Sequence, residues 1–201
     1  MILAVALVLI SAPAMAADRV VVAIGDSLTA GFGLAPAEAL PAVLERRLRV
    51  GGLEVRVVTA GVSGDTTAGG RARLDWALPG RVDLVILALG ANDMLRGIAP
   101  ATARGNLDAM LARLAERGIP VLLAGMRAPL NLGADYARAF DAIYPELAAR
   151  YGVPLYPFLL EGVAFRAELN LDDGLHPNAA GVARIVDGLA PMVRAALRAA
   201  P

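Results

Sequence analysis

The chain has 201 residues, of which 57% are hydrophobic, and 19 basic residues balance 19 acidic residues to a formal net charge of zero. This composition excludes an intrinsically disordered protein, and the charge balance excludes a nucleic-acid binder that works by bulk positive charge. The chain contains no lysine, no cysteine and one histidine, which excludes Schiff-base and P-loop lysines, disulfides, thiol nucleophiles, cysteine-ligated metals and multi-histidine metal sites.

The N-terminus carries the pattern of a secretory signal. Residues 2–10 form an apolar run, and Ala14-Met15-Ala16 then has the small-residue spacing of a signal-peptidase site. The run is too short to cross a bilayer as a helix of the mature protein. We therefore predict a signal peptide over residues 1–16, cleaved after Ala16, and a periplasmic or secreted protein with no integral membrane span. No basic residue precedes the run, so an N-terminal tail packed on the domain is the alternative.

From residue 20 onward, short apolar runs alternate with segments of helical periodicity. Near-continuous apolar runs are typical of strands that are buried on both faces of a parallel sheet. The predicted strands are residues 20–24, 55–59, 84–89, 121–125 and 155–158. The predicted helices are residues 37–49, 68–78, 101–117, 135–150 and 179–198.

Capping and breaking residues support these helices. Thr66 or Thr67 can cap the second helix, Asn178 can cap the last, and Gly118 is a typical residue after a helix end. Pro145 predicts a kink in the fourth helix. Regular alternation of strands and helices, without repeats or linkers, predicts one α/β domain over residues 17–201, with helices on both faces of a five-stranded, mostly parallel sheet.

Four polar, glycine-rich stretches interrupt this apolar pattern. Three follow predicted strands and the fourth precedes the last helix. They are Gly25-Asp26-Ser27, Gly61-Val62-Ser63-Gly64-Asp65-Thr66-Thr67, Gly90-Ala91-Asn92-Asp93 and Asp172-Asp173-Gly174-Leu175-His176-Pro177. Ligands of open α/β sheets bind outside the carboxyl ends of the strands, so we expect these stretches to meet there.

Ser27 and His176 are the candidate reactive pair. The chain has three serines, and His176 is its one imidazole. A serine hydroxyl is a poor nucleophile until a base takes its proton, and histidine titrates near neutrality. Asp173, three residues before His176, can accept a hydrogen bond from Nδ1 and so direct Nε2 toward the serine. Asp172 is the alternative carboxylate, and Ser63 is the alternative nucleophile.

Three groups are candidates for binding an oxyanion. Gly64 can offer its backbone N–H at close approach, Asn92 can offer its side-chain amide, and Ser27 can offer its own N–H. Taken singly, Gly64 and Asn92 are better explained as ordinary turn residues, but their joint placement after the second and third strands favours the oxyanion role. The carboxylates beside these groups are predicted to brace their own loops and not to transfer protons: Asp26, Asp65 and Asp93.

Taken in order, these stretches resemble the four sequence blocks of the SGNH hydrolases, also called GDSL esterases or lipases. The matching blocks are Gly25-Asp26-Ser27-Leu28, Gly64, Gly90-Ala91-Asn92-Asp93 and Asp173-Gly174-Leu175-His176-Pro177. They cover nearly the whole mature chain. The likeness is greatest to the bacterial periplasmic branch of acyl-CoA thioesterases, arylesterases and lysophospholipases, which residues 142–147 and 153–158 also resemble. Gly-x-Ser-x-Gly is missing, which argues against the nucleophile elbow of the α/β-hydrolases.

The resemblance implies a flavodoxin-like fold, a triad of Ser27, His176 and Asp173, and an oxyanion hole made by Ser27, Gly64 and Asn92. It also implies hydrolysis of aryl esters, acyl-CoA thioesters or lysophospholipids through an acyl-enzyme. We expect a monomer that needs no metal ion or organic cofactor and binds no nucleic acid. The alternatives are a carbohydrate O-acetyl esterase and a non-catalytic lipid- or glycan-binding module.

The chain departs from its relatives at two of the blocks. Ala91 stands where they usually carry glycine, and its methyl group is expected either to trim the acyl pocket or to alter the loop, without removing the Asn92 donor. Thr59-Ala60-Gly61 replaces their usual Asn-Ala-Ser, which affects the expected loop hydrogen bonds. Residues 126–133 carry apolar side chains after the fourth strand, and they are equally consistent with one side of an acyl groove and with an ordinary surface loop.

Overall fold

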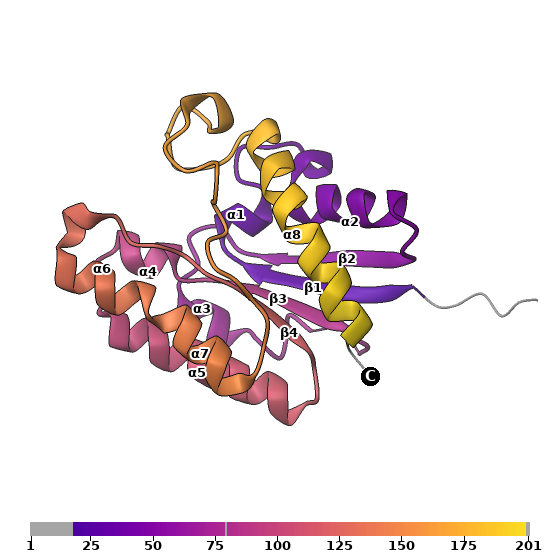
Figure 1. Ribbon diagram of the computed structural model, residues 1–201, viewed down its shortest axis with the longest axis horizontal. Helices are drawn as coiled ribbons and strands as arrows, with labels where there is room; N and C mark the ends of the chain where they lie inside the picture. Colours follow the sequence, from indigo (N-terminus) through magenta and orange to yellow (C-terminus); the bar gives the residue numbers. More distant parts are fainter. Residues whose placement is uncertain (1–17, 79, 200–201) are drawn as a thin grey trace, which may run out of the picture.

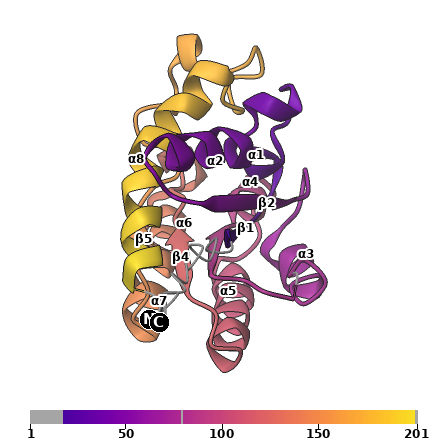
Figure 2. The ribbon, with the colours of Figure 1, turned by 90° about the vertical axis from the view of Figure 1, so that its right-hand side faces the viewer.

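The computed structural model describes residues 18–78 and 80–199. The predicted signal peptide, residues 1–16, lies outside these ranges. The described chain forms a five-stranded sheet between two layers of helices (Figures 1 and 2). The strand order is β2-β1-β3-β4-β5, and every neighbouring pair is parallel. The predicted three-layer architecture and the number of strands are confirmed.

The strands are β1 (Arg19–Gly25), β2 (Val55–Gly61), β3 (Leu84–Ala88), β4 (Val121–Ala124) and β5 (Leu155–Tyr156). The α-helices are α1 (Ser27–Ala30), α2 (Leu40–Val50), α3 (Thr67–Ala72), α4 (Ala91–Leu95), α5 (Pro100–Glu116), α6 (Ala134–Asp141), α7 (Ile143–Tyr151) and α8 (Ala179–Ala199). Three short 3₁₀ helices complete the list: η1 (Pro36–Glu38), η2 (Leu130–Leu132) and η3 (Ala167–Leu169).

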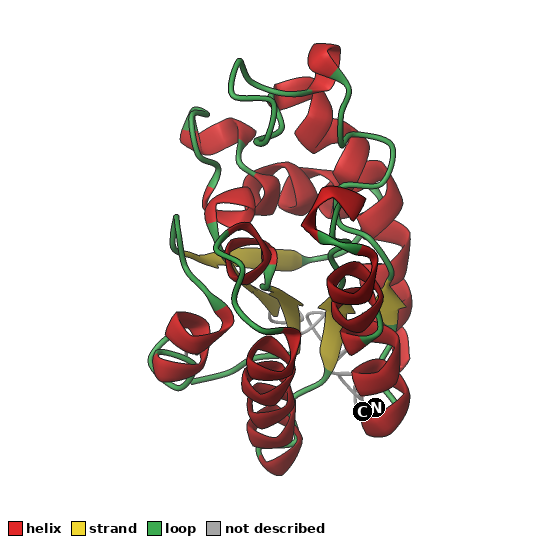
Figure 3. Ribbon diagram, turned by 90° about the vertical axis from the view of Figure 1, so that its left-hand side faces the viewer, coloured by secondary structure: helices red, strands yellow, loops and turns green. Residues whose placement is uncertain are grey.

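The register of the central strands brings their carboxyl ends together. Gly25, the last residue of β1, lies opposite Gly61 at the end of β2 and Ala88 at the end of β3. The segments that follow these three strands therefore leave the sheet at the same edge. Figure 3 shows the molecule from this side, with short helices and loops gathered over the strand ends.

The helices divide between the two faces of the sheet. Helix α2 packs against α8 and β2 on one face. Helices α3, α5 and α7 lie on the other face, where α5 contacts both of its neighbours (Figures 1 and 2). Within the described ranges, no helix is both long and apolar enough to cross a membrane.

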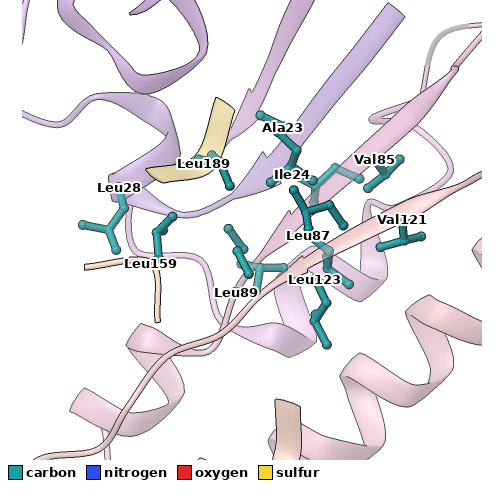
Figure 4. Close-up of a cluster of buried hydrophobic side chains, with 14 of the residues drawn as sticks. Ala23, Ile24, Leu28, Val85, Leu87, Leu89, Val121, Leu123, Leu159 and Leu189 are labelled. Atoms are coloured by element: carbon teal, nitrogen blue, oxygen red, sulfur yellow. The ribbon is translucent and has the colours of Figure 1, made fainter. Parts of the chain in front are cut away.

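The core is built on the two central strands. All residues of β1 after Arg19 and all residues of β3 are buried, as expected for strands covered on both faces. Figure 4 shows part of this core, where side chains from β1, β3 and β4 meet leucines from α1, α8 and the segment after β5. The labelled residues are Ala23, Ile24, Leu28, Val85, Leu87, Leu89, Val121, Leu123, Leu159 and Leu189.

Two predicted helices are each divided at a proline. The predicted helix 37–49 is instead η1 followed by α2, with extended backbone at Ala39. Pro41 has no N–H for the Ala37 carbonyl, which accepts from Arg46 instead. The predicted helix 135–150 is α6 followed by α7, separated at Ala142, because Pro145 has no N–H for the Asp141 carbonyl.

The predicted helix 68–78 is also wrong in its length. Helix α3 ends at Ala72, and residues 73–77 form turns. The next residue, Arg73, turns toward the sheet edge and bonds there to carbonyls of two other segments. The capping predictions are confirmed: Thr66 accepts from the Gly69 N–H, Asn178 accepts from the Gly181 N–H, and Gly118 has a φ of 64°.

Candidate active site

Ser27 lies where β1 passes into α1 without a longer loop. Asp26, between them, caps the helix, and its Oδ1 accepts a hydrogen bond from the Leu28 N–H at 3.0 Å. Gly61 on the neighbouring strand allows α1 to lie close to the sheet, because a Cβ there would come within 2.4 Å of the Ala30 nitrogen. The predicted role of Asp26 in orienting the serine loop is confirmed.

Asp26 is a buried carboxylate, with 1% of its surface exposed. Burial disfavours the charged form and raises the pKa of Asp26 to about 6, although the Leu28 N–H, His176 and the Asn92 amide act in the opposite direction. The folded protein therefore holds a proton on this group at a pH where the unfolded chain releases it.

An Asp26→Asn variant tests this buried charge. The raised pKa makes the free energy of unfolding of the wild type fall as pH rises from about 4 to about 6, by roughly 3 kcal/mol in total. Asparagine stays neutral throughout, so the free energy of unfolding of the variant should not show the part of this fall that Asp26 causes. Urea unfolding at about pH 4 and about pH 7 measures the difference. Parallel declines in the two proteins would show that Asp26 does not titrate in this range.

Ser27, His176 and Asp173 form a continuous chain of hydrogen bonds. Ser27 Oγ lies 2.9 Å from His176 Nε2, and His176 Nδ1 lies 2.6 Å from Asp173 Oδ2. Ser27 is 9% exposed, and it lines a small cavity together with His176. The structure thus brings together three residues that come from the two ends of the described chain.

Asp173 is fixed by a tight turn before α8. Its Oδ1 accepts from the N–H groups of Leu175 and His176, both at 2.9 Å. These two backbone donors, followed by the His176 side chain, lower the pKa of Asp173 to about 2, so it is a carboxylate at neutral pH. Asp172, the alternative in the sequence, makes no hydrogen bond to His176 in the described part of the chain.

One neighbour of the histidine was missed at the sequence level. The Phe32 ring lies against the His176 imidazole, with ring centroids 4.4 Å apart. Phe32 follows α1 by two residues and is 49% exposed. It covers one side of the imidazole and so favours a single ring orientation. A lone phenylalanine in a glycine-rich loop carries no signal that would have identified this contact.

Asn92 stands beside Ser27, since both line the same small cavity together with His176. Its Nδ2 donates to the Asp65 carbonyl at 3.0 Å and, at the longer distance of 3.4 Å, to Asp26 Oδ2. The shorter bond fixes the amide. The longer bond is weak, so this second N–H remains available to an acceptor that enters the cavity.

Gly64 follows β2 at the same edge of the sheet. Its φ of 81° lies in the left-handed region that favours glycine, and its carbonyl accepts from Arg96 at 2.7 Å. Among the described residues, Gly64 is not one of those that line the cavity shared by Ser27, Asn92 and His176. Of the three predicted oxyanion donors, Gly64 is the one that the structure leaves outside this cavity.

One partly buried ion pair and several hydrogen bonds hold the loops in place. Arg73 bonds to Asp65 Oδ2 at 2.6 Å and also reaches the Ala60 and Gly25 carbonyls at 2.9 Å, so it ties the second loop to the first. Asp93 was expected to brace its own loop, but its carboxylate instead accepts from the N–H and hydroxyl of Thr67. It therefore anchors the start of α3.

The cavity at Ser27 adjoins a larger apolar groove. The cavity measures about 110 Å³ and the groove about 260 Å³. Five residues line both the cavity and the groove: Met94, Leu95, Met126, Leu160 and Leu175. Ala91 lines the cavity, as its predicted effect on the pocket requires. Residues 126–129 line the groove, so the first half of the 126–133 loop is part of it.

Within the part of the chain that the structure describes, no group of three or more histidine, aspartate or glutamate side chains is arranged to hold a metal ion.

Comparisons with known proteins agree with this geometry. A model of the GDSL-like Lipase/Acylhydrolase family matches residues 23–184. The chain is 39% identical over 180 residues to esterase TesA of Pseudomonas aeruginosa, covering 89% of this chain and 90% of that protein. It is 38% identical over 189 residues to thioesterase 1/protease 1/lysophospholipase L1 of Escherichia coli K12, covering 94% and 89%.

A solved structure is also similar. AlinE4, described as an SGNH-hydrolase family esterase, is 50% identical, with a TM-score of 0.77, over 92% of this chain and 99% of AlinE4. The family match spans all four blocks between Gly25 and His176, which confirms the resemblance inferred from the sequence. The chain therefore belongs to the GDSL-like lipase/acylhydrolase family.

Proposed function

We propose that this protein hydrolyses carboxylic esters and thioesters with Ser27 as nucleophile, His176 as general base and Asp173 as the residue that orients the histidine. The observation that carries the proposal is the hydrogen-bonded chain from Ser27 through His176 to Asp173, at 2.9 and 2.6 Å. The relatives described above are named as an esterase and as a thioesterase and lysophospholipase, which agrees with this chemistry.

In the first half of the reaction, His176 Nε2 takes the Ser27 proton while Oγ attacks the substrate carbonyl carbon. The ionised Asp173 accepts from Nδ1–H, which leaves Nε2 free to act as the base and stabilises the imidazolium that forms. His176 then gives the proton to the leaving alcohol or thiol as the carbonyl re-forms. The acyl group remains on Ser27.

In the second half, water replaces the leaving group. His176 takes a proton from the water, the resulting hydroxide attacks the acyl carbon, and the proton returns to Ser27 Oγ as the carboxylic acid departs. His176 thus serves twice as base and twice as acid. The steps balance without an oxidant, a reductant or any further reactant.

Each tetrahedral intermediate places negative charge on the former carbonyl oxygen. We assign the Asn92 amide and the Ser27 N–H as donors to this oxygen, with the Gly64 N–H joining them from the adjoining loop. The weak Asn92 bond to Asp26 supports the first assignment, because the amide can leave it for a charged oxygen. Within the described ranges, no backbone carbonyl accepts a hydrogen bond from the Ser27 or Gly64 N–H outside the regular helix and strand bonds.

The apolar groove supports an acyl substrate over an acetylated sugar. Its walls are mostly carbon, from methionine, leucine, alanine, proline and phenylalanine side chains, with Arg127 and Asn170 as the polar exceptions, and it shares five lining residues with the cavity at Ser27. A sugar would leave its hydroxyl groups unpaired against such walls, whereas an alkyl chain gains from burial there. This favours medium or long acyl esters, thioesters and lysophospholipids as the substrate class.

A series of p-nitrophenyl esters of increasing acyl length tests this function. We expect kcat/KM to rise from acetate to medium chains, by up to about fourfold for each methylene that enters the groove. An acetate-only optimum would instead support the O-acetyl esterase. Failure to hydrolyse any ester, together with failure of a fluorophosphonate to label Ser27, would support the binding module.

We also propose that the enzyme is a monomer and is exported from the cytoplasm. All the proposed catalytic groups come from one chain, which supports a monomeric enzyme that acts on a small acyl substrate and requires no nucleic acid. The apolar run and the Ala14-Met15-Ala16 site support export to the periplasm or medium. N-terminal sequencing of the exported protein, with Ala17 expected as the first residue, tests the cleavage.

A further inference from the structure

Phe165 combines two features that are unusual for a phenylalanine. It is 89% exposed, although phenylalanine is one of the residue types most often buried in protein cores. It also has a φ of 64°, and in the described part of the chain it is the one non-glycine residue with a positive φ. Bulky residues in the left-handed region are rare, and such strain persists only where the surroundings enforce it.

The surroundings that enforce this conformation include Asn170. This side chain is buried, and its Nδ2 donates to the Val163 carbonyl at 2.8 Å and to the Arg166 carbonyl at 2.7 Å. The two acceptors flank Phe165 in the chain. Asn170 therefore closes residues 163–166 into a compact turn that holds Phe165 outward. The reaction described above makes no use of Asn170.

The turn places Phe165 at the apolar groove. Phe165 and Asn170 line the apolar groove, together with Pro129 from the facing loop. None of these three lines the smaller cavity at Ser27. A short acyl group on Ser27 occupies the cavity and stays clear of Phe165, whereas a long acyl chain must pass into the groove where the ring stands.

We propose that Phe165 is a specificity-determining residue. Its ring forms part of the groove wall and packs against long acyl chains, so the enzyme favours them over acetyl groups. The proposal rests on the function proposed above. Since the ring touches the chain equally in the ground state and the transition state, its contribution falls on KM and not on kcat. The ring is exposed in the free enzyme so that it can contact an alkyl chain, which covers it on binding.

A Phe165→Gly variant tests the proposal. Glycine accepts a φ of 64° without strain, so the substitution removes the ring while preserving the turn. With p-nitrophenyl decanoate we expect KM to rise about tenfold at unchanged kcat, which corresponds to one or two buried methylenes at about fourfold each. With p-nitrophenyl acetate both parameters should stay at wild-type values. The variant should unfold at the same temperature as the wild type or higher.

Trp76→Ala provides the matched control. Trp76 is 93% exposed and lines neither the cavity nor the groove, so its removal should leave the ratio of decanoate to acetate hydrolysis unchanged. An unchanged ratio in Phe165→Gly, with acetate hydrolysis intact, would overturn the proposal while the catalytic function stands. Loss of both activities in a folded Phe165→Gly protein would also overturn it. A wild type that hydrolyses neither ester would overturn the proposed function itself.

Discussion

Ser27→Ala is expected to lower kcat by about 10⁴-fold or more, and His176→Ala by a similar factor, because the members of a catalytic triad act as a unit. The double variant should be little worse than either single variant for the same reason. Alanine at position 27 leaves no hydroxyl for the acyl group, and alanine at position 176 leaves no base within reach of Ser27. Hydrolysis of p-nitrophenyl butyrate by protein freed of host esterases measures both effects.

Ser63→Ala is the matched control for the nucleophile. Ser63 is an exposed residue in the loop after β2, at the same edge of the sheet as Ser27, and it is the alternative nucleophile in the sequence. Its substitution should leave kcat within about twofold, and a fluorophosphonate should label the Ser63→Ala protein but not the Ser27→Ala protein. Near-wild-type turnover by Ser27→Ala, or label recovered on Ser63, would make the assignment of Ser27 wrong.

The features that could be predicted from the sequence are those encoded by local patterns. The apolar runs at β1 and β3 identify buried strands, and parallel pairing then brings their carboxyl ends to one edge. The turn from Asp173 to His176 is also local, since three residues bring the carboxylate to the imidazole. Consequently Ser27 and His176 could be proposed as a reactive pair from the sequence although they are far apart in the chain, and the structure places them within hydrogen-bond distance.

The features that escaped prediction depend on long-range packing. Arg73 ends α3 early because its guanidinium bonds to carbonyls of two other segments, and neither is visible from the helix itself. Asp93 anchors Thr67 in a different loop. The groove joins the loop after β4 with residues 158–165, which have no regular pattern of their own. Periodicity describes a segment, and these contacts arise only when segments meet.

Asn92→Ala is expected to lower kcat by about 10²–10³-fold, the usual cost of one lost oxyanion donor. The amide faces the cavity at Ser27 while its bond to the Asp65 carbonyl holds it in place. Its interaction with the substrate oxygen strengthens as negative charge develops there. The loss should therefore appear in kcat, with KM changed by less than about threefold. Steady-state hydrolysis of a p-nitrophenyl ester separates the two parameters.

Asn106→Ala is the matched control, because it also removes a mostly buried asparagine. Asn106 donates to Thr67 Oγ1 at 3.1 Å and does not line the cavity at Ser27. Both variants leave a polar partner without its donor and should lose about 1–3 kcal/mol of stability. Only Asn92→Ala should lose turnover. Equal falls in kcat would show that Asn92 acts through the stability of the loops, and a rise in KM alone would place its amide on the substrate before the oxyanion forms.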